Sequence, residues 1–279
     1  MMKTLRSIVN IALIEWRNVF YSTKLCMLGL IFIFINIQIV TPLKECSILM
    51  NDKISYFEPF VAICNSGIVL LVLPLFYLAI ISDFPQNDGI AYFVHIRCTS
   101  LQWVAGEILF LVLSTVTMVG FVLLSGVLLV GKRGKFSFQY SDAVTKYVAS
   151  YPEKAGDYVT QLLPENLYNQ ISLRDTILNS LVLIILYFLL IGSIIFFFAL
   201  IHQKYIGFLV DGILIFAGVV TSELHMQSMW YFPLAHTVQW LHYTEYISVP
   251  IVSMRSSYTY FGIILTIFII DCVAIRKRY

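Results

Sequence analysis

Long apolar runs, each close to the length of one membrane crossing, dominate the pattern of hydrophobic and polar positions. A hydrocarbon core about 30 Å thick requires about 20 apolar residues in a helix. Six runs meet that requirement, at residues 22–40, 60–81, 104–130, 176–201, 206–222 and 258–275. In lipid only helices and closed barrels satisfy their own backbone groups. We therefore predict an all-α polytopic membrane protein with six transmembrane helices, folded as a single transmembrane domain over residues 1–279.

Individual residues refine these predicted spans. Pro74 indicates a kink in the second span. Ser172, followed three residues later by Asp175, predicts a capping box at the start of the fourth span. Before the first span, residues 1–21 place apolar side chains at helical spacing, with polar side chains elsewhere on the helix. This pattern predicts an amphipathic helix, either at the membrane surface or packed on a partner.

Two interspan segments are too polar to cross a membrane cleanly. Residues 131–175, with Pro152 and Pro164 at plausible first helical turns, predict a small helical loop outside the membrane. Residues 223–257 combine aromatic residues with Pro233 and Pro250, which predicts short re-entrant helices in the outer leaflet. An aromatic belt at the interface is an equal alternative. The outer-gate candidates in this segment are Trp230, Tyr231, Trp240, His242 and Glu245.

Composition and charge agree with a membrane protein. Hydrophobic residues make up 59% of the 279 residues and charged residues only 12%, against roughly 25% charged residues in soluble domains. The net charge of +2 is too balanced to indicate a nucleic-acid partner. Basic residues before the first span and after the last place both termini in the cytoplasm. Lys132, Arg133 and Lys135 oppose this topology, although they begin a long loop, where the charge rule is weaker.

Motifs for nucleotide, metal or hydrolytic chemistry are incomplete. Residues 126–132 approach a phosphate-binding loop, but Arg133 replaces its hydroxyl residue and the context is the end of an apolar helix. His225, His236 and His242 lack the spacing of a zinc-binding helix. We therefore expect no cofactor or metal on this chain. The five cysteines are isolated in sequence and suit apolar packing.

Asp211 and Asp271 lie inside predicted spans, where an ionisable side chain is costly and often functional. A structural alternative places both at the membrane edge. There Asp271 would meet the basic residues at 276–278, and Asp211 would meet Lys204 about two helical turns away. We predict these edge pairings in preference to a functional role.

The loop after the second span reads ISDFPQNDGIAYFVHIRCTSLQWVAGEIL over residues 81–109. It resembles the permeases of ABC transporters of the second exporter class. The matching features are an acidic residue, a glycine, an apolar helix, an arginine, small hydroxyl residues and a glycine that opens the next span. They correspond here to Asp88, Gly89, residues 90–96, Arg97, Thr99, Ser100 and Gly106. Glu107 departs from the pattern, because the family usually has a lysine there.

The resemblance implies an exporter subunit of the bacterial cytoplasmic membrane. Its partners would be two separate ATPase subunits, which hold ATP and magnesium, and a second permease, identical or homologous. The cytoplasmic loop 82–103 would couple to the ATPase through Asp88, Gly89, Ile90, Phe93, Val94 and Arg97. Ile90, Phe93 and Val94 form an apolar stripe at helical spacing. The substrate is expected to be an amphipathic peptide, a lipid or an apolar drug.

Two other functions compete with this expectation. One is an ion-coupled transporter or channel that uses Asp211 and Asp271 as coupling groups. The other, weaker, is an intramembrane hydrolase at His242 and Glu245. Otherwise the chain itself is expected not to be an enzyme.

Overall fold

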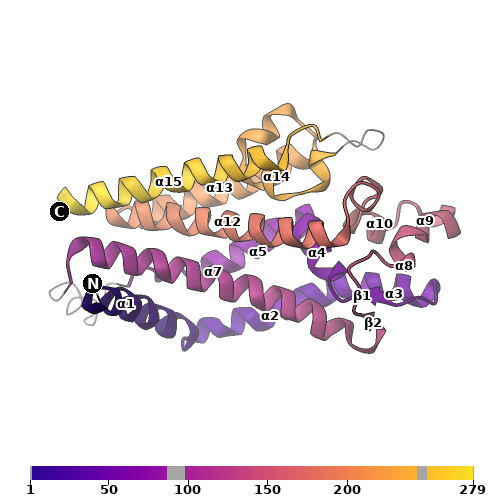
Figure 1. The fold of residues 1–279 in the computed structure, drawn as a ribbon, viewed down its shortest axis with the longest axis horizontal. Coiled ribbons are helices and arrows are strands. Elements are labelled where there is room, and N and C mark those ends of the chain that lie inside the picture. The colour runs from indigo at the N-terminus through magenta and orange to yellow at the C-terminus, as the bar shows by residue number, and fades with distance from the viewer. Residues whose placement is uncertain (1, 87–97, 244–249, 279) are drawn as a thin grey trace.

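The computed structural model describes residues 2–86, 98–243 and 250–278. It is almost entirely helical, and its long helices run side by side along one axis (Figure 1). Within the described residues, five helices are long and apolar enough to cross a membrane: Thr23–Leu49, Ser100–Arg133, Leu173–Leu200, Lys204–Glu223 and Met254–Ile275. A bent pair, α4 (Glu58–Asn65) and α5 (Gly67–Ile80), makes a sixth crossing if it counts as one span. The predicted helical class is confirmed.

The first crossing is longer than its apolar run indicated. It joins η1 (Thr23–Leu25), α2 (Cys26–Ile35), a π-helical turn η2 (Asn36–Val40) and α3 (Thr41–Leu49). The other long helices are α7 (Ser100–Val130), α12 (Leu173–Leu200), α13 (Lys204–Glu223) and α15 (Met254–Arg278). Both termini lie at one end of the bundle (Figure 1). We call this end the terminus end and the opposite end the loop end.

The N-terminal helix α1 (Met2–Phe20) packs against the first turns of α7. Its buried face consists of Ile11, Ala12, Glu15 and Val19, whereas the apolar side chains of Leu5 and Val9 are exposed. The contact is close at Gly106, because a side chain there would overlap Ile11. The predicted amphipathic helix is therefore present, and one of its faces packs against the bundle.

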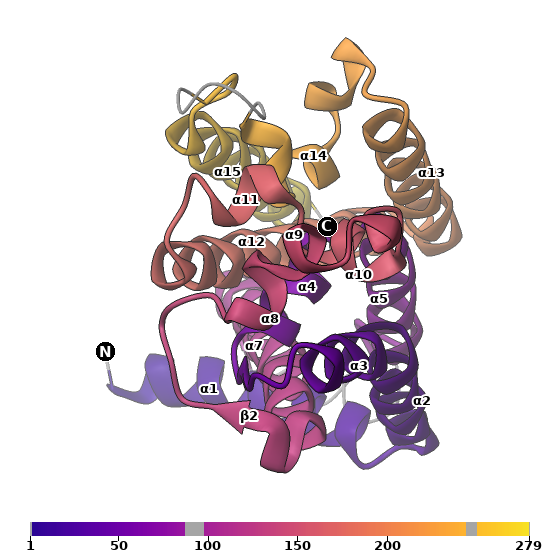
Figure 2. The same ribbon diagram turned by 90° about the vertical axis from the view of Figure 1, so that its right-hand side faces the viewer.

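Short elements cover the loop end (Figure 2). The segment after α7 forms η3 (Gly131–Arg133), β2 (Gly134–Lys135), α8 (Asp142–Thr145), α9 (Tyr147–Ser150), η4 (Pro152–Lys154), α10 (Tyr158–Leu162) and α11 (Glu165–Tyr168). β2 pairs in parallel with β1 (Ile54–Ser55), so Ile54 lies beside Gly134. The predicted small helical loop is thus present, with a short strand pair that the sequence pattern did not indicate. Gly131, at φ 58°, ends α7, which agrees with its reading as a helix end.

The loop-end elements are tied to the bundle by a buried carboxylate. Glu58, at the start of α4, accepts hydrogen bonds from the Ser55 amide at 2.9 Å and the Ser141 hydroxyl at 3.0 Å. Lys135 forms an ion pair with Asp52 at 3.1 Å, next to the strand pair. The Glu58–Ser141 bond and the Lys135–Asp52 pair each join residues 83 positions apart, so they fix the loop over α4.

The second span departs most from its prediction. The helix bends by 87° between α4 and α5, at Ser66, while Pro74 lies inside the continuous helix α5. The expected kink at Pro74 is therefore replaced by a complete break eight residues earlier. Ser66 has extended backbone angles, φ −98° and ψ 122°, which end α4 before Gly67 starts the next helix.

The contact between α1 and α7 can be tested by filling Gly106. We expect Gly106→Ala to lower the stability of the protein by about 1–3 kcal/mol, because overpacking forces Ile11 to shift. The control is Gly120→Ala in the same helix, where an added Cβ meets nothing within 4 Å. Denaturant unfolding in detergent measures both variants. Equal stability of the two would show that α1 does not pack closely on α7.

Candidate functional site

Asn65 is the last residue of α4 and joins the broken span to the segment before α15. Its side-chain amide donates to the Val61 carbonyl at 2.9 Å, and its side-chain oxygen accepts from the Gln239 amide at 2.8 Å. Its own carbonyl accepts from the Trp240 indole at 3.0 Å. Asn65 is 1% exposed, and leaving a buried polar group unpaired costs about 1–3 kcal/mol. The break is therefore closed by bonds to another segment.

The same segment is also bonded to α12 and to the loop. The Gln239 side chain donates to the Thr176 carbonyl at 2.8 Å and to the Ser180 hydroxyl at 2.6 Å. Asn166 of α11 donates to the Trp240 carbonyl at 3.0 Å. Residues 239–240 consequently link the broken span, α12 and the loop at one point.

A pocket of about 660 Å³ opens beside this junction. It lies between the helix break, α10 and the end of α13, in the size range of small-molecule sites. Its apolar wall comes from Ile68, Leu71, Leu162 and Val219, and its aromatic side chains are Tyr158 and Trp240. The remaining lining residues are Asn65, Ser66, Gly67, Thr160, Gln161, Pro164 and Glu223. A large apolar wall with a few polar groups suits an amphipathic molecule.

A cluster of two imidazoles and one hydroxyl lies next to this junction. His236 belongs to α14 (Pro233–Thr237) and His242 to η6 (Trp240–His242), while Ser257 lies in α15. The Ser257 oxygen is 2.9 Å from His236 Nδ1 and 3.5 Å from His242 Nε2. Trp230, in η5 (Gln227–Tyr231), places its ring 5.5 Å from that of His236 and 5.0 Å from that of His242.

Backbone carbonyls fix the protons of both imidazoles. His236 Nε2 faces the Trp230 carbonyl at 2.9 Å, and His242 Nδ1 faces the Val252 carbonyl at 2.7 Å. A carbonyl only accepts, so each of these nitrogens carries the hydrogen. The other nitrogen of each neutral ring is then an acceptor, and the single Ser257 hydrogen goes to the nearer one, His236. Burial lowers the pKa of His236 to about 4 and also lowers the pKa of His242.

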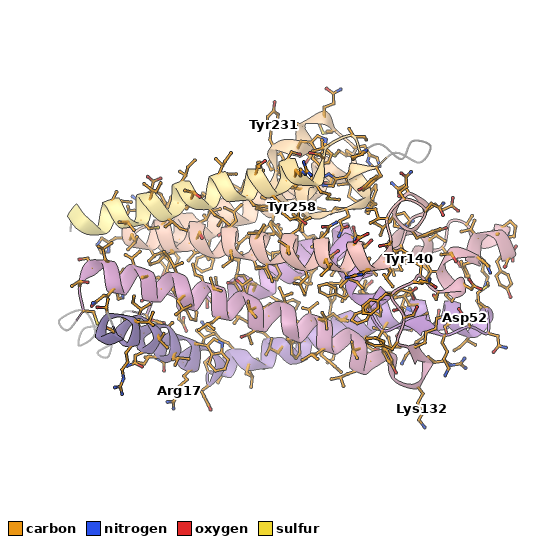
Figure 3. The ribbon with its side chains drawn as sticks, viewed as in Figure 1. Arg17, Asp52, Lys132, Tyr140, Tyr231 and Tyr258 are labelled. Carbon is orange, nitrogen blue, oxygen red and sulfur yellow. The ribbon has the colours of Figure 1, made fainter. Side chains whose placement is uncertain are left out.

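The structure brings together only part of the predicted outer gate. Trp230 and His242 are in ring contact, whereas Trp240 lines the neighbouring pocket and meets His225 edge-on, with 5.7 Å between the ring centroids. Tyr231 is 81% exposed and projects away from the helices (Figure 3). The short helices before the last span are present. His236 and His242 share Ser257 as a polar neighbour, whereas His225 does not belong to this cluster.

Several predicted site residues lie outside the described residues. They include Glu245, so the suggested pairing of His242 with Glu245 stays a prediction. The whole predicted ATPase-coupling set also belongs to them: Asp88, Gly89, Ile90, Phe93, Val94 and Arg97. The basic side chains at 276–278, expected to meet Asp271, lie outside them as well.

Asp211 does not form the expected edge pair. It is fully buried, and neither side-chain oxygen has a hydrogen-bond partner among the described residues. Lys204 instead lies within electrostatic range of Asp83 and Glu15. Seven residues of helix separate Lys204 from Asp211 by about 10 Å, so the lysine stays at the terminus end. The Asp211 carboxyl lies within electrostatic range of the buried phenols of Tyr77 and Tyr187.

Sequence reasoning missed the residues that organise this region. Asn65 lies inside a predicted apolar span, and Ser257 follows another serine just before the last span, so neither belongs to a spacing motif that would mark it as functional. The dipeptide Ser66-Gly67 offered a signal, because glycine and a small hydroxyl residue inside an apolar run favour a helix break.

The histidine cluster predicts a pH dependence of stability. The folded protein keeps His236 neutral down to about pH 4, whereas the unfolded chain takes up a proton near pH 6.5. Stability is therefore complete above about pH 6.5 and falls as the pH drops toward 4. We expect His236→Gln to weaken this dependence in thermal unfolding at pH 7.5 and 4.5. The exposed His202, changed to Gln, is the control, and an unchanged pH dependence in His236→Gln would contradict the assignment.

Comparisons with known proteins do not assign this chain to a family. No protein-family model, curated protein or solved structure matches the chain. The fold, the pocket beside the broken span and the resemblance in residues 81–109 are therefore the basis for a proposed function.

Proposed function

We propose that this chain is the membrane-spanning permease subunit of an ATP-driven exporter of the second ABC class. The order of its elements supports the proposal: an amphipathic helix, up to six crossings, and short helices before the last crossing. In this proposal the terminus end faces the cytoplasm and the loop end faces outward. The chain would work with a second permease and two separate ATPase subunits that hold ATP and magnesium.

One observation carries the proposal, namely that α1 holds both flanks of the motif-bearing loop. The Asn18 amide donates to the Gln86 side chain at 2.6 Å, directly before residues 87–97. Directly after them, the Ser7 hydroxyl lies 3.0 Å from the Cys98 sulfur. Thr99 then caps α7, because its side chain accepts from the Gln102 amide at 3.3 Å. A loop that is fixed at both ends on a packed helix can transmit a conformational change in the ATPase to the membrane-spanning helices.

The packing of α1 would extend that path into the bundle. The Trp16 indole donates to Thr117 of α7 at 3.1 Å. The Glu15 carboxylate accepts from the Gln86 amide at 3.3 Å. Movement of the loop would therefore displace α1 and α7 together. In this proposal the pocket at the loop end lies on the substrate side.

A second candidate function, an ion-coupled transporter, is favoured by Asp211. A buried carboxyl without a hydrogen-bond partner among the described residues is costly inside a membrane and often marks an ion or proton path. In that case the chain would transport its substrate along an ion gradient with no ATPase present. Asp271 is partly exposed and gives this candidate no comparable support.

The exporter proposal is tested by the double change Phe93→Ala, Val94→Ala. Truncating a buried aromatic anchor commonly costs about 2 kcal/mol or more, so we expect ATPase association to weaken roughly tenfold or more. The measurement is affinity purification of the tagged chain from its native membrane, with co-purified ATPase subunits quantified by mass spectrometry. Vanadate-sensitive ATP hydrolysis is the second readout.

Asp211→Asn serves as the control and separates the two candidates. Under the exporter proposal this variant binds the ATPase and supports ATP hydrolysis like the wild type. Wild-type retention of the ATPase by the Phe93, Val94 variant would contradict the coupling assignment. Transport by the purified chain alone, driven by an ion gradient and lost in Asp211→Asn, would favour the second candidate.

A further inference from the structure

The charged group that lines the pocket beside the broken span is negative. Among the described residues that line it, Glu223 is the only acidic side chain, and none is a lysine, arginine or histidine. The described part of the pocket therefore offers no positive side chain to pair with an anionic ligand. A ligand that carries a positive charge would find a carboxylate.

The Glu223 carboxylate is held close to the helix break. It ends α13, and a Cβ atom added at Gly67 would overlap its Oε1 atom. The carboxylate thus lies against the first residue of α5, where a helix N-terminus favours negative charge. Because Gly67 has no side chain, the Glu223 carboxylate has room beside it. Glu223 itself is exposed, so its charge is available at the pocket mouth.

The other walls suit the body of an organic cation. Tyr158 and Trp240 supply aromatic rings, which attract cations through their faces. Ile68, Leu71 and Val219 supply apolar surface next to them, and Ile68 is 52% exposed. An amphipathic molecule with a cationic group would bury its apolar part on this wall and place its charge near Glu223.

We propose that this pocket binds hydrophobic organic cations. The proposal goes beyond export itself, because it concerns binding by this chain alone and needs no ATPase. Its failure would leave the coupling proposal intact, and loss of ATPase association would leave this binding intact. It also narrows the substrate classes considered from sequence to those that carry a positive charge.

The test uses two probes of nearly equal size and opposite charge, tetraphenylphosphonium and tetraphenylborate. Binding to the purified full chain is measured by equilibrium dialysis in micelles of an uncharged maltoside detergent, with protein-free micelles as the blank. We expect the wild type to bind the phosphonium more tightly than the borate. Glu223→Gln should weaken phosphonium binding about fivefold or more and leave borate binding no weaker.

Two further variants make the test specific. Glu153→Gln removes an exposed carboxylate elsewhere in the loop and should leave phosphonium binding at the wild-type level. Gly67→Ala keeps the charge but pushes the Glu223 carboxylate from its place, so it should also weaken phosphonium binding. Equal binding of the two probes, or wild-type phosphonium binding by Glu223→Gln, would overturn the proposal.

A phospholipid with an ammonium group in its headgroup also carries a positive group. One arm of the experiment therefore tests whether such a lipid occupies the pocket. Adding phosphatidylethanolamine to the micelles should leave phosphonium binding to the wild type within about twofold. Complete displacement of the phosphonium by that lipid would show that the pocket is a lipid site, and the proposal would be wrong.

Discussion

The arrangement of the loop end depends on how the polar groups at the break in the second span are satisfied. A helix that ends inside a bundle leaves carbonyl and amide groups that need partners from outside the helix. Asn65 meets this requirement with bonds to Val61, Gln239 and Trp240. Its partners come from a segment more than 170 positions later in the chain. The break therefore exists only when that segment is in place.

The break in the second span also forms the pocket of the candidate site. The 87° bend turns the start of α5 toward the end of α13, so Gly67 lies against the Glu223 carboxylate. Trp240, held by Asn65, forms part of the pocket wall. At the other end, α1 holds both flanks of the predicted coupling loop. In the proposed exporter, α7 is the element shared by the two ends, since α1 packs on its start and the loop-end elements follow its last residue.

Sequence periodicity predicted the helical class, the long spans and the N-terminal helix, because long apolar runs allow few other structures in lipid. The cap formed by Ser172 and Asp175 is also present, with the Ser172 oxygen accepting from the Asp175 amide at 3.2 Å. Pairings between distant residues could not be predicted this way. The break at Ser66 depends on Gln239 and Trp240, and the burial of Asp211 depends on the helices that surround it. Local charge spacing therefore misled the Asp211 prediction, because it could not show which helices surround that side chain.

The most direct test of this account is hydrogen–deuterium exchange across residues 238–243, compared between the wild type and Asn65→Leu. Loss of the Asn65 oxygen removes the acceptor of the Gln239 amide, and an unpaired buried group costs about 1–3 kcal/mol. The account predicts slow exchange in the wild type, exchange roughly tenfold faster in the variant, and no change in the middle of α12. Equally slow exchange in Asn65→Leu would contradict the claim that Asn65 closes the break and holds the pocket.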